Sequence, residues 1–498
     1  MQAFGCKNFR KFKNLPMMDL GGINIFVGTN NSGKSTAIKA LMLTLLNAKR
    51  KQSNMLKYES EKSMLPPFMY MFDFAFEVLE HLYLGDFKSA LNFNSDDKNI
   101  CFSFFNGSTF FSFTCTSQND RLPSAYFVKS EIVNERSGTK YTYNYLFKPH
   151  QHGRLPQYGT VTCEFSIPEE EEKDFKHAID EQICKYEKLI SERHSDKIRR
   201  ELEQYQICRE TYNNGGRTFC LTYNFFRQNQ THDIKDATPH HQYLKDLFTK
   251  RNEIITHDFK SLPSIQYIET HNASHKLLLD KEDKNNYLAQ TTSIYLRNTG
   301  GLDHYNESSF ICKWMKEFGV GSSLEIEDVY GEAYRINIIE SDGRSVPLAH
   351  KGTGTIQLIN LLMRLACYGA GELGKDNVII VIEEPEQNMH PALQSKLADL
   401  FYEVWKNKGG KVRFVVETHS EYLVRRLQVI AAQEIERGNY TTDEINDNIK
   451  VVYFPVNKDP YPMDFDDYGY FIRDFDSGFF DEAGRSYREL VRMERGIK

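Results

Sequence analysis

The sequence predicts an α/β fold of two lobes with a helical insertion, and three observations lead to this prediction. Mostly apolar runs at 23–28, 378–382 and 412–416 indicate buried parallel strands, because strands covered on both faces are continuously apolar. Residues 99–167 alternate apolar and polar side chains, as in an antiparallel sheet with one solvated face. Residues 168–210 are charged and free of glycine, which favours helix.

Composition narrows the class of protein. The chain has 498 residues, of which 40% are hydrophobic, enough for more than one large core. A net charge of −6 excludes a global basic field for nucleic acid, although a local basic patch stays open. The nine cysteines include no CxxC pair, which indicates reduced thiols in a cytoplasmic protein. No run of about 18 apolar residues occurs, so we expect no membrane span.

Shifts in composition predict four segments. Residues 1–167 form the first lobe, with a phosphate loop and the antiparallel sheet. Residues 168–260 form a helical insertion and a return strand, and residues 261–456 form a second lobe of alternating strands and helices. The extension 457–498 is predicted to be irregular. The second lobe is therefore expected to carry a mostly parallel sheet.

Two local signals refine the middle of the chain. Asn106-Gly107 is a favoured turn pair between two alternating runs, which predicts a hairpin. The charged stretch 168–210 predicts an amphipathic helix or a helical hairpin broken near Ser195. Two interpretations of this stretch remain open, namely packing on its own lobe and projection as an arm for a partner.

A phosphate-binding loop is the most specific motif. The segment from Gly28 to Ser35 fits G-x-x-x-x-G-K-[ST], with an apolar strand before it and an amphipathic helix after it. Its glycines let backbone N–H groups point at phosphates, and the helix N-terminus adds positive charge. Lys34 is expected to pair with the β- and γ-phosphates, and Ser35 to ligate Mg²⁺. The loop residues predicted to contact the nucleotide are Gly28, Asn30, Asn31, Ser32, Gly33, Lys34, Ser35 and Thr36.

Two further strand ends carry candidate catalytic groups. Glu383 and Glu384 follow the apolar run 378–382, and the carboxyl edge of a parallel sheet is where ligands bind. Glu383 is predicted to hold Mg²⁺, and Glu384 to polarise the attacking water as general base. His419 ends the next apolar strand, where it is expected to contact the γ-phosphate or orient the water.

These segments, with the glycine-rich stretch before the apolar helix at 355–366, resemble the ABC-type ATPase family that includes the SMC and RecF proteins. The likeness is greatest to the overcoming-lysogenization-defect (OLD)-like ATPases, which include ATPase subunits of the PARIS and Septu anti-phage defence systems. It covers about 1–45 and 260–485. The motifs that carry it are "KNFRKF" at 7–12, "VGTNNSGKST" at 27–36, "IEEPEQNMHP" at 382–391, "ETHSEYLVRRL" at 417–427 and "DSGFFDE" at 476–482.

The resemblance implies a two-lobe ABC-type ATPase head with a composite site for ATP and Mg²⁺. In this family two heads sandwich ATP, and a signature segment of one head caps the γ-phosphate held by the other. By position, Lys351 to Gly354 would be that segment, so Gly352, Thr353 and Gly354 are predicted to contact ATP on a second copy. A homo-oligomer is implied, with a dimer as the smallest unit. No serine stands among these glycines, only Thr353, and Gln266 is a candidate for the family's glutamine-bearing loop.

Full OLD proteins carry a TOPRIM nuclease, which needs an acidic metal site. Asp464, Asp466 and Asp467 are candidates, but too few residues follow the last predicted strand for another domain, so an ordinary acidic loop is favoured. The histidines within 149–153 and 238–242 lack suitably spaced cysteines or acids and are interpreted as loop residues. We therefore expect an effector that acts in trans.

Three functions follow from this combination. The first is an ATPase subunit of a prokaryotic anti-phage defence system, which controls a separate effector such as a nuclease by ATP-dependent assembly. DNA or a phage protein would be its trigger. The alternative is a RecF- or SMC-like DNA-binding ATPase in DNA repair. The third is a scaffold in which ATP is structural and scarcely turned over.

Overall fold

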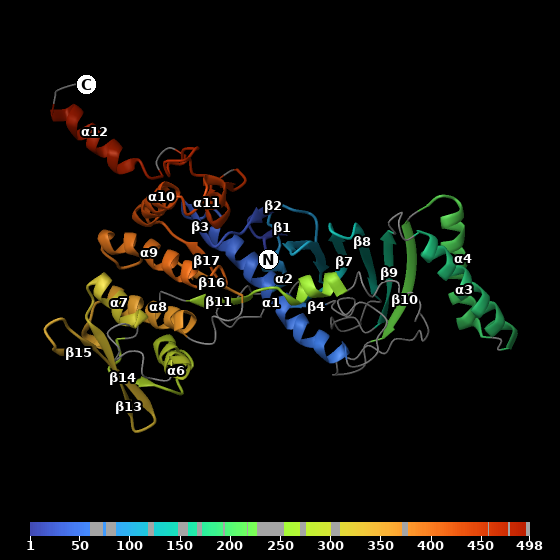
Figure 1. The fold of residues 1–498 in the computed structure, drawn as a ribbon, viewed down its shortest axis with the longest axis horizontal. Coiled ribbons are helices and arrows are strands. Elements are labelled where there is room, and N and C mark those ends of the chain that lie inside the picture. Colours follow the sequence, from blue (N-terminus) through green and yellow to red (C-terminus); the bar gives the residue numbers. More distant parts are fainter. Residues whose placement is uncertain are drawn as a thin grey trace. The chain divides into compact units, whose positions relative to one another are not determined.

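The computed structural model divides into two compact units (Figure 1). Unit 1 contains residues 1–19 and 39–262, and unit 2 contains residues 20–38 and 263–498. The residues that the structure describes are 1–59, 73–75, 86–117, 124–147, 158–166, 172–192, 195–216, 218–226, 253–268, 275–299, 309–370, 377–456, 458–476 and 479–494.

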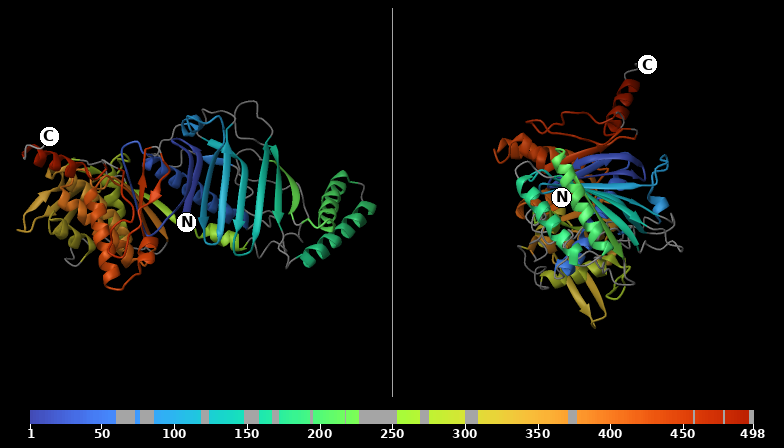
Figure 2. Two further views of the ribbon diagram at one scale, coloured as in Figure 1. Left: turned by 90° about the horizontal axis from the view of Figure 1, so that it is seen from above. Right: turned by 90° about the vertical axis from the view of Figure 1, so that its right-hand side faces the viewer.

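The described strands of unit 1 form a nine-stranded antiparallel sheet, as the alternation in residues 99–167 predicts (Figure 2). The order is β10-β9-β8-β7-β6-β5-β1-β2, with β4 beside β7. Alternate residues of β5 are buried, as one covered face requires. The strands are β1 (Ala3–Phe9), β2 (Phe12–Asp19), β4 (Asp73–Ala75), β5 (Ile100–Asn106), β6 (Thr109–Thr116), β7 (Ser124–Asn134), β8 (Thr139–Phe147), β9 (Tyr158–Ser166) and β10 (Thr218–Phe226). The short helix α2 (Phe87–Ala90) precedes β5.

Aromatic side chains fill one face of this sheet. Phe104 of β5 stacks on Phe111 of β6 with ring centroids 4.9 Å apart, and both rings lie against Phe259. Phe259 belongs to the helical segment 253–260, so this segment covers the aromatic face. Burial of each such side chain stabilises the fold by roughly 1.5–3 kcal/mol, and stacked pairs add to this.

The charged stretch 168–210 contains a helical hairpin, and Ser195 is the N-cap of its second helix. The hairpin consists of α3 (Glu172–Glu192) and α4 (Asp196–Asn213), which lie beyond β10 in Figure 1. Phe175 of α3 packs against two phenylalanines of β9 and β10. The apolar faces of the hairpin are therefore covered within unit 1, which supports packing on its own lobe. A partner for the charged faces remains a prediction.

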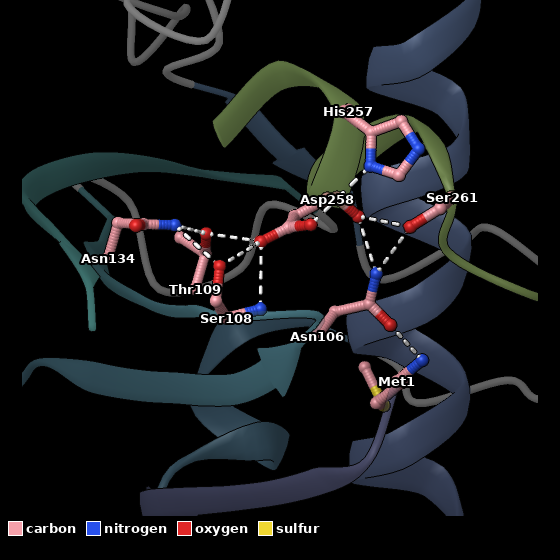
Figure 3. Close-up of polar contacts among 8 residues, drawn as sticks. All are labelled: Met1, Asn106, Ser108, Thr109, Asn134, His257, Asp258 and Ser261. Atoms are coloured by element: carbon pink, nitrogen blue, oxygen red, sulfur yellow. Dashed lines mark hydrogen bonds and ion pairs between the residues drawn. The ribbon is translucent and has the colours of Figure 1, made fainter. Parts of the chain in front are cut away.

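A buried carboxylate joins the segment 253–260 to the hairpin between β5 and β6 (Figure 3). Asp258 is 6% exposed and accepts hydrogen bonds from the backbone N–H of Ser108 and from the hydroxyls of Ser108 and Thr109, at 2.9, 3.1 and 2.7 Å. Asn134 donates to the same two hydroxyl oxygens at 2.9 and 2.6 Å. Each hydroxyl thus both donates and accepts, so the network is satisfied without water.

Unit 2 is built on a mostly parallel sheet that carries the phosphate loop. Its described strands run in the order β11-β16-β17-β3-β18-β19, and β19 is antiparallel. The predicted first lobe, residues 1–167, includes the strand before the phosphate loop, but this strand, β3, pairs with β17 and β18 on either side. The strands are β3 (Ile23–Gly28), β11 (Ser264–Ile268), β16 (Val378–Glu383), β17 (Val412–Glu417), β18 (Ile449–Phe454) and β19 (Tyr461–Pro462).

Amphipathic helices and a small second sheet complete unit 2. Leu362, Leu397 and Leu427, from three successive helices, are fully buried in one core with the strands of the parallel sheet. The helices are α6 (Tyr287–Thr299), α7 (Phe310–Phe318), α8 (Thr353–Ala370), α9 (Pro391–Asn407), α10 (Glu421–Glu436) and α11 (Thr442–Asn448). The small sheet contains β12 (Leu279–Asp280), β13 (Ser323–Val329), β14 (Ala333–Ile339) and β15 (Ser345–Pro347).

The sequence predicts an irregular segment 457–498, and this prediction is wrong in part. Strand β19 extends the parallel sheet, and residues near the end form helix α12 (Glu482–Glu494). Asp466 accepts hydrogen bonds from the backbone N–H groups of Tyr468 and Tyr470, both at 2.9 Å. This turn supports the interpretation of Asp464, Asp466 and Asp467 as an ordinary acidic loop. The described residues include no group of three His, Cys, Asp or Glu suited to a metal.

Three other predictions concern cysteines, histidines and membranes. All nine cysteines are free in the structure, as the absence of paired spacing predicts. No helix in the described part of the chain is long and apolar enough to cross a membrane. The histidine-bearing segments 149–153 and 238–242 lie outside the described residues.

Candidate nucleotide site

The phosphate loop joins β3 to the N-terminus of α1 (Lys34–Glu59). A Cβ added to Gly28 would overlap the backbone oxygen of Phe454, so the close approach of β18 requires glycine at this position. Asn31 adopts a left-handed conformation with φ +61, which turns the loop back toward the helix. Asn30 and Asn31 are exposed at the tip, Ser35 and Thr36 are half-buried, and Ser32 is buried with its N–H bonded to Thr29 O at 3.2 Å.

Lys34 folds back over its own loop. Its side chain is 3% exposed, and Nζ donates to the carbonyl oxygens of Gly28 and Thr29 at 3.0 and 3.1 Å. Nζ also lies 3.6 Å from Oε1 of Glu417. Burial lowers the pKa of Lys34, and the Glu417 carboxylate opposes this effect. The ammonium group is therefore held at the phosphate loop by three oxygens.

Glu384 lies at a strained turn directly after β16. Its φ is +45, a left-handed conformation that is uncommon for glutamate and is typical of functional sites. The backbone N–H of Glu384 donates to the carbonyl oxygen of Glu417 at 2.8 Å, which fixes the turn against β17. Gln387 Nε2 donates to Glu384 Oε2 at 3.1 Å. The carboxylate remains 32% exposed, so a water molecule can reach it.

His419 lies beside Glu384 at this edge of the sheet. Its Nε2 is 3.7 Å from Glu384 Oε1. Its backbone N–H donates to Oε1 of Glu386 at 2.7 Å, and Ser420 then caps α10 through the N–H of Leu423. Burial lowers the pKa of His419, and the positive charge of Lys34 adds to the lowering. The ring is therefore neutral at pH 7, and it can both donate and accept a hydrogen bond.

Two glutamates that were assigned no role in the sequence analysis lie within this site. Glu417 accepts a hydrogen bond from the hydroxyl of Ser35 at 3.0 Å, and Glu386 holds the backbone of His419. Burial raises the pKa of both carboxyls, and Lys34 opposes this for Glu417. One sequence signal could have revealed Glu417, because it ends an apolar run in the same way as Glu383.

The glycine segment before α8 has neighbours of its own. Thr353 Oγ1 lies 3.3 Å from Nε2 of His275, whose Nδ1 is 3.2 Å from the carbonyl oxygen of Ala349. A Cβ at Gly354 would overlap the backbone oxygen of Asn388, in the loop after the acidic strand. Gly352 is exposed and has open space around its Cα. The segment thus packs against the loop after β16, and Gly352 remains accessible.

Gln266 does not lie in a loop. It is in the middle of β11, opposite Ile380 of β16, and its side chain is exposed. The apolar residues on either side of it form a strand, because they pair with the buried run of β16. The expected glutamine-bearing loop is therefore not found at this residue.

The residues at the sheet edge fit a Mg²⁺ ion bound together with a nucleotide. Ser35 offers a hydroxyl oxygen, and Glu383 and Glu417 are register partners at the ends of adjacent strands. Oε2 of Glu417 is buried and has no hydrogen-bond partner among the described residues. Proteins commonly hold Mg²⁺ with one or two carboxylates plus the phosphates of a substrate, so this donor set is suitable.

Comparison with known proteins places the chain in a family. The profile of the AAA ATPase domain matches residues 1–424, a span that includes the phosphate loop, the acidic strand and His419. The chain belongs to the AAA ATPase domain family. Because the AAA ATPase domain is an ATP-binding fold, the nucleotide expected at this loop is ATP. The match ends within α10, so the last strands and α12 lie outside the matched span.

The solved structures similar to this AAA ATPase domain protein include SMC heads. One is the Smc head domain with an extended coiled coil bound to the C-terminal domain of ScpA, from Pyrococcus furiosus. It shares 12% identity, covers 98% of this chain and 99% of that chain, and has a TM-score of 0.32. The SMC head domain from Thermotoga maritima shares 11% identity, and the match covers 94% of this chain and 100% of that chain, with a TM-score of 0.31. No curated protein matches the chain.

Proposed function

We propose that the protein binds ATP with Mg²⁺ and hydrolyses it slowly. The observation that supports this most directly is the approach of Lys34, Ser35, Glu384 and His419 at one edge of the parallel sheet. These groups come from β3 and α1, from β16 and from β17, so the fold alone brings them together. They are the groups that phosphoryl transfer to water needs, namely phosphate ligands, a metal ligand and a base.

Each side chain has a role that follows from its environment. Lys34 pairs with phosphate oxygens, and its present partners Gly28 O and Thr29 O keep it aimed at the loop. Glu384 accepts a proton from the attacking water, because its turn is fixed while its carboxylate is half-exposed. His419, neutral at pH 7, orients that water or donates to the γ-phosphate. Ser35 and Glu383 would hold Mg²⁺, which would supply positive charge to the phosphates.

The complete site is proposed to need two copies of the chain. The segment Gly352 to Gly354 begins α8 with an accessible N-terminus, which suits an anion such as a γ-phosphate. In the resembling family this segment acts on the nucleotide of the partner. Gly354 contacts Asn388, which lies in the loop that follows Glu384. The catalytic base and the capping segment would therefore move together. A dimer in the cytoplasm is therefore the smallest proposed unit.

The cellular role that we propose is control of a separate effector in anti-phage defence, with DNA or a phage protein as trigger. Its support is the resemblance of the four motifs to OLD-like ATPases. Cells that carry the natural operon should survive phage infection, and Lys34→Ala should abolish that protection. Copurification of a nuclease or another effector with the tagged protein would support control in trans. Protection that persists with Lys34→Ala would contradict this role.

The ATPase proposal is tested with Lys34→Ala and Glu384→Gln. Lys34→Ala should lose ATP binding, because the ammonium group is the main positive partner of the phosphates. Glu384→Gln should keep ATP binding and slow hydrolysis by about 10²–10⁴-fold, the usual contribution of a general base. It should also accumulate an ATP-bound dimer, measured by light scattering after gel filtration.

The matched control is Glu436→Gln, a neutralised carboxylate at an exposed position on α10. It should bind and hydrolyse ATP like the wild type. Undetectable hydrolysis by the wild type, with no effect of Glu384→Gln on ATP occupancy or assembly, would favour the scaffold function. A wild-type protein that binds no ATP at all would overturn the proposal.

A further inference from the structure

Glu417 occupies a position between the two phosphate-loop residues that carry the chemistry. Its Oε1 accepts the hydroxyl proton of Ser35 at 3.0 Å and lies 3.6 Å from Lys34 Nζ. The residue is 5% exposed, and its Oε2 has no hydrogen-bond partner among the described residues. A buried carboxylate with one oxygen unsatisfied is costly, so a further ligand at this place would stabilise it.

We propose that Glu417 is a positioning residue for the Mg²⁺ of bound ATP. It acts through Ser35, whose hydroxyl has one proton and two lone pairs. Because that proton is donated to Glu417, the lone pairs of Ser35 are directed away from the carboxylate and toward the cation. This inference rests on the proposed ATP site, and it assigns to Glu417 a role that neither the phosphate-loop motif nor the acidic strand specifies.

The charge of Glu417 supports the same role. Glu417 and Glu383 are register partners at the ends of adjacent parallel strands, so two carboxylates meet at one edge. Lys34 offsets part of this charge at 3.6 Å, but it will also face the phosphates. A divalent cation near Ser35 would offset the remainder. Residues that orient a metal ligand typically contribute about 10–100-fold to metal affinity, so the effect is measurable.

A purely structural role is the competing explanation, in which Glu417 only holds Lys34. The two explanations predict a different dependence of ATP affinity on Mg²⁺. Loss of Lys34 positioning would weaken ATP binding equally with and without the metal. Loss of Ser35 orientation would raise the Mg²⁺ concentration that tight binding requires, while binding in EDTA would change little.

The experiment titrates MgCl₂ into the full-length protein with a fluorescent ATP analogue and records binding rather than turnover. Glu417→Leu removes the acceptor with little change in volume, and Lys34 keeps its two carbonyl acceptors, Gly28 O and Thr29 O. We expect its half-saturating Mg²⁺ concentration to rise about 10–100-fold, with binding in EDTA within about 3-fold of the wild type. Glu417→Gln retains an acceptor oxygen and should fall between the two.

Ser35→Ala completes a double-mutant cycle. If Glu417 acts through Ser35, adding Glu417→Leu to Ser35→Ala should shift the Mg²⁺ requirement by less than about 2-fold, because coupled residues are not additive. Glu417→Ala replaces the leucine variant if that variant does not fold. A wild-type Mg²⁺ requirement in Glu417→Leu, a proportional loss in EDTA, or independent effects in the cycle would each overturn the inference. A wild-type protein that binds no analogue would instead overturn the ATP site itself.

Discussion

Glu386 shows how one buried carboxylate can support a catalytic neighbour at an electrostatic cost. Its Oε1 accepts the backbone N–H of His419 at 2.7 Å, and this bond sets where β17 delivers the histidine. The side chain is almost wholly buried, and burial raises the pKa of its carboxyl. The same atom therefore positions His419 and carries a charge that is poorly solvated.

Glu386→Gln tests this cost through pH. A glutamate whose pKa is raised in the folded state contributes most to stability below its ordinary pKa of about 4.3, and this contribution is lost as pH rises through the folded value. Glutamine keeps the acceptor for His419 without the charge. The stability of Glu386→Gln relative to the wild type should therefore increase as pH rises above about 4.3, measured by urea unfolding at a series of pH values. The exposed Glu436→Gln should show no such trend, and a pH-independent difference for Glu386→Gln would contradict the account.

Gly354 is a second residue at which a single atom decides the outcome. In an ordinary helix, alanine in place of glycine is favourable by about 1 kcal/mol. Here the new Cβ would overlap the backbone oxygen of Asn388, so the loop after β16 must move. Gly354→Ala should destabilise the protein by about 1–3 kcal/mol and slow ATP turnover.

Gly352→Ala is the matched control for Gly354→Ala, because nothing lies within 4 Å of a Cβ built at Gly352. Its unfolding free energy should stay within about 0.5 kcal/mol of the wild type. Both variants are measured by chemical denaturation and by an ATPase assay. Equal stability of the two variants would show that the contact between α8 and the loop after β16 tolerates an extra methyl group.

At the scale of elements, unit 1 is held together by contacts that are distant in sequence. The segment 253–260 packs on the aromatic face of the sheet, and its Asp258 carboxylate accepts hydrogen bonds from Ser108 and Thr109 of the hairpin. Because the two segments lie about 150 residues apart in the sequence, side chains must anchor one to the other. The network in Figure 3 supplies such an anchor with a single side chain.

Asp258→Ala should therefore destabilise unit 1 by about 2–4 kcal/mol, since one buried and two half-buried donors would lose their shared acceptor. Hydrogen exchange should quicken at the backbone N–H of Ser108 before it does in β9. His257→Ala is the control, because this ring is 80% exposed. Its removal should change the free energy of unfolding by less than about 0.5 kcal/mol. Similar effects of the two variants would remove the anchor role.

At the scale of the whole molecule, much of the fold is predictable from the sequence. Period-two alternation predicts β5 to β9, and continuous apolar runs predict β3, β16 and β17, because one-sided and two-sided burial leave different patterns. Spacing also predicts an amphipathic helix or a helical hairpin broken near Ser195, and the structure contains the hairpin. Helix α12 is missed although Tyr487, Leu490 and Val491 have the spacing of one helix face, because it follows a stretch rich in Asp and Phe that is interpreted as irregular to the end.

The order of strands explains what the sequence cannot disclose about the site. The motifs locate Lys34, Glu384 and His419, since each follows a recognisable strand. That Glu417 faces Ser35 depends on β17 lying next to β3, and this pairing joins segments nearly 400 residues apart. The apolar run before Glu417 places it at a strand end, but local patterns carry no signal for its neighbour, so its contact with Ser35 is recognised only once the sheet is assembled.

The same pairing has a consequence for synthesis on the ribosome. Strand β3 leaves the ribosome early, but its partners β17 and β18 are translated only near the end of the chain. At about 5–20 residues per second, this delay is roughly 20–80 s. Throughout that time an apolar strand and its phosphate loop have no sheet to join. The proposed ATP site of a nascent chain therefore cannot form until β17 and β18 have been made.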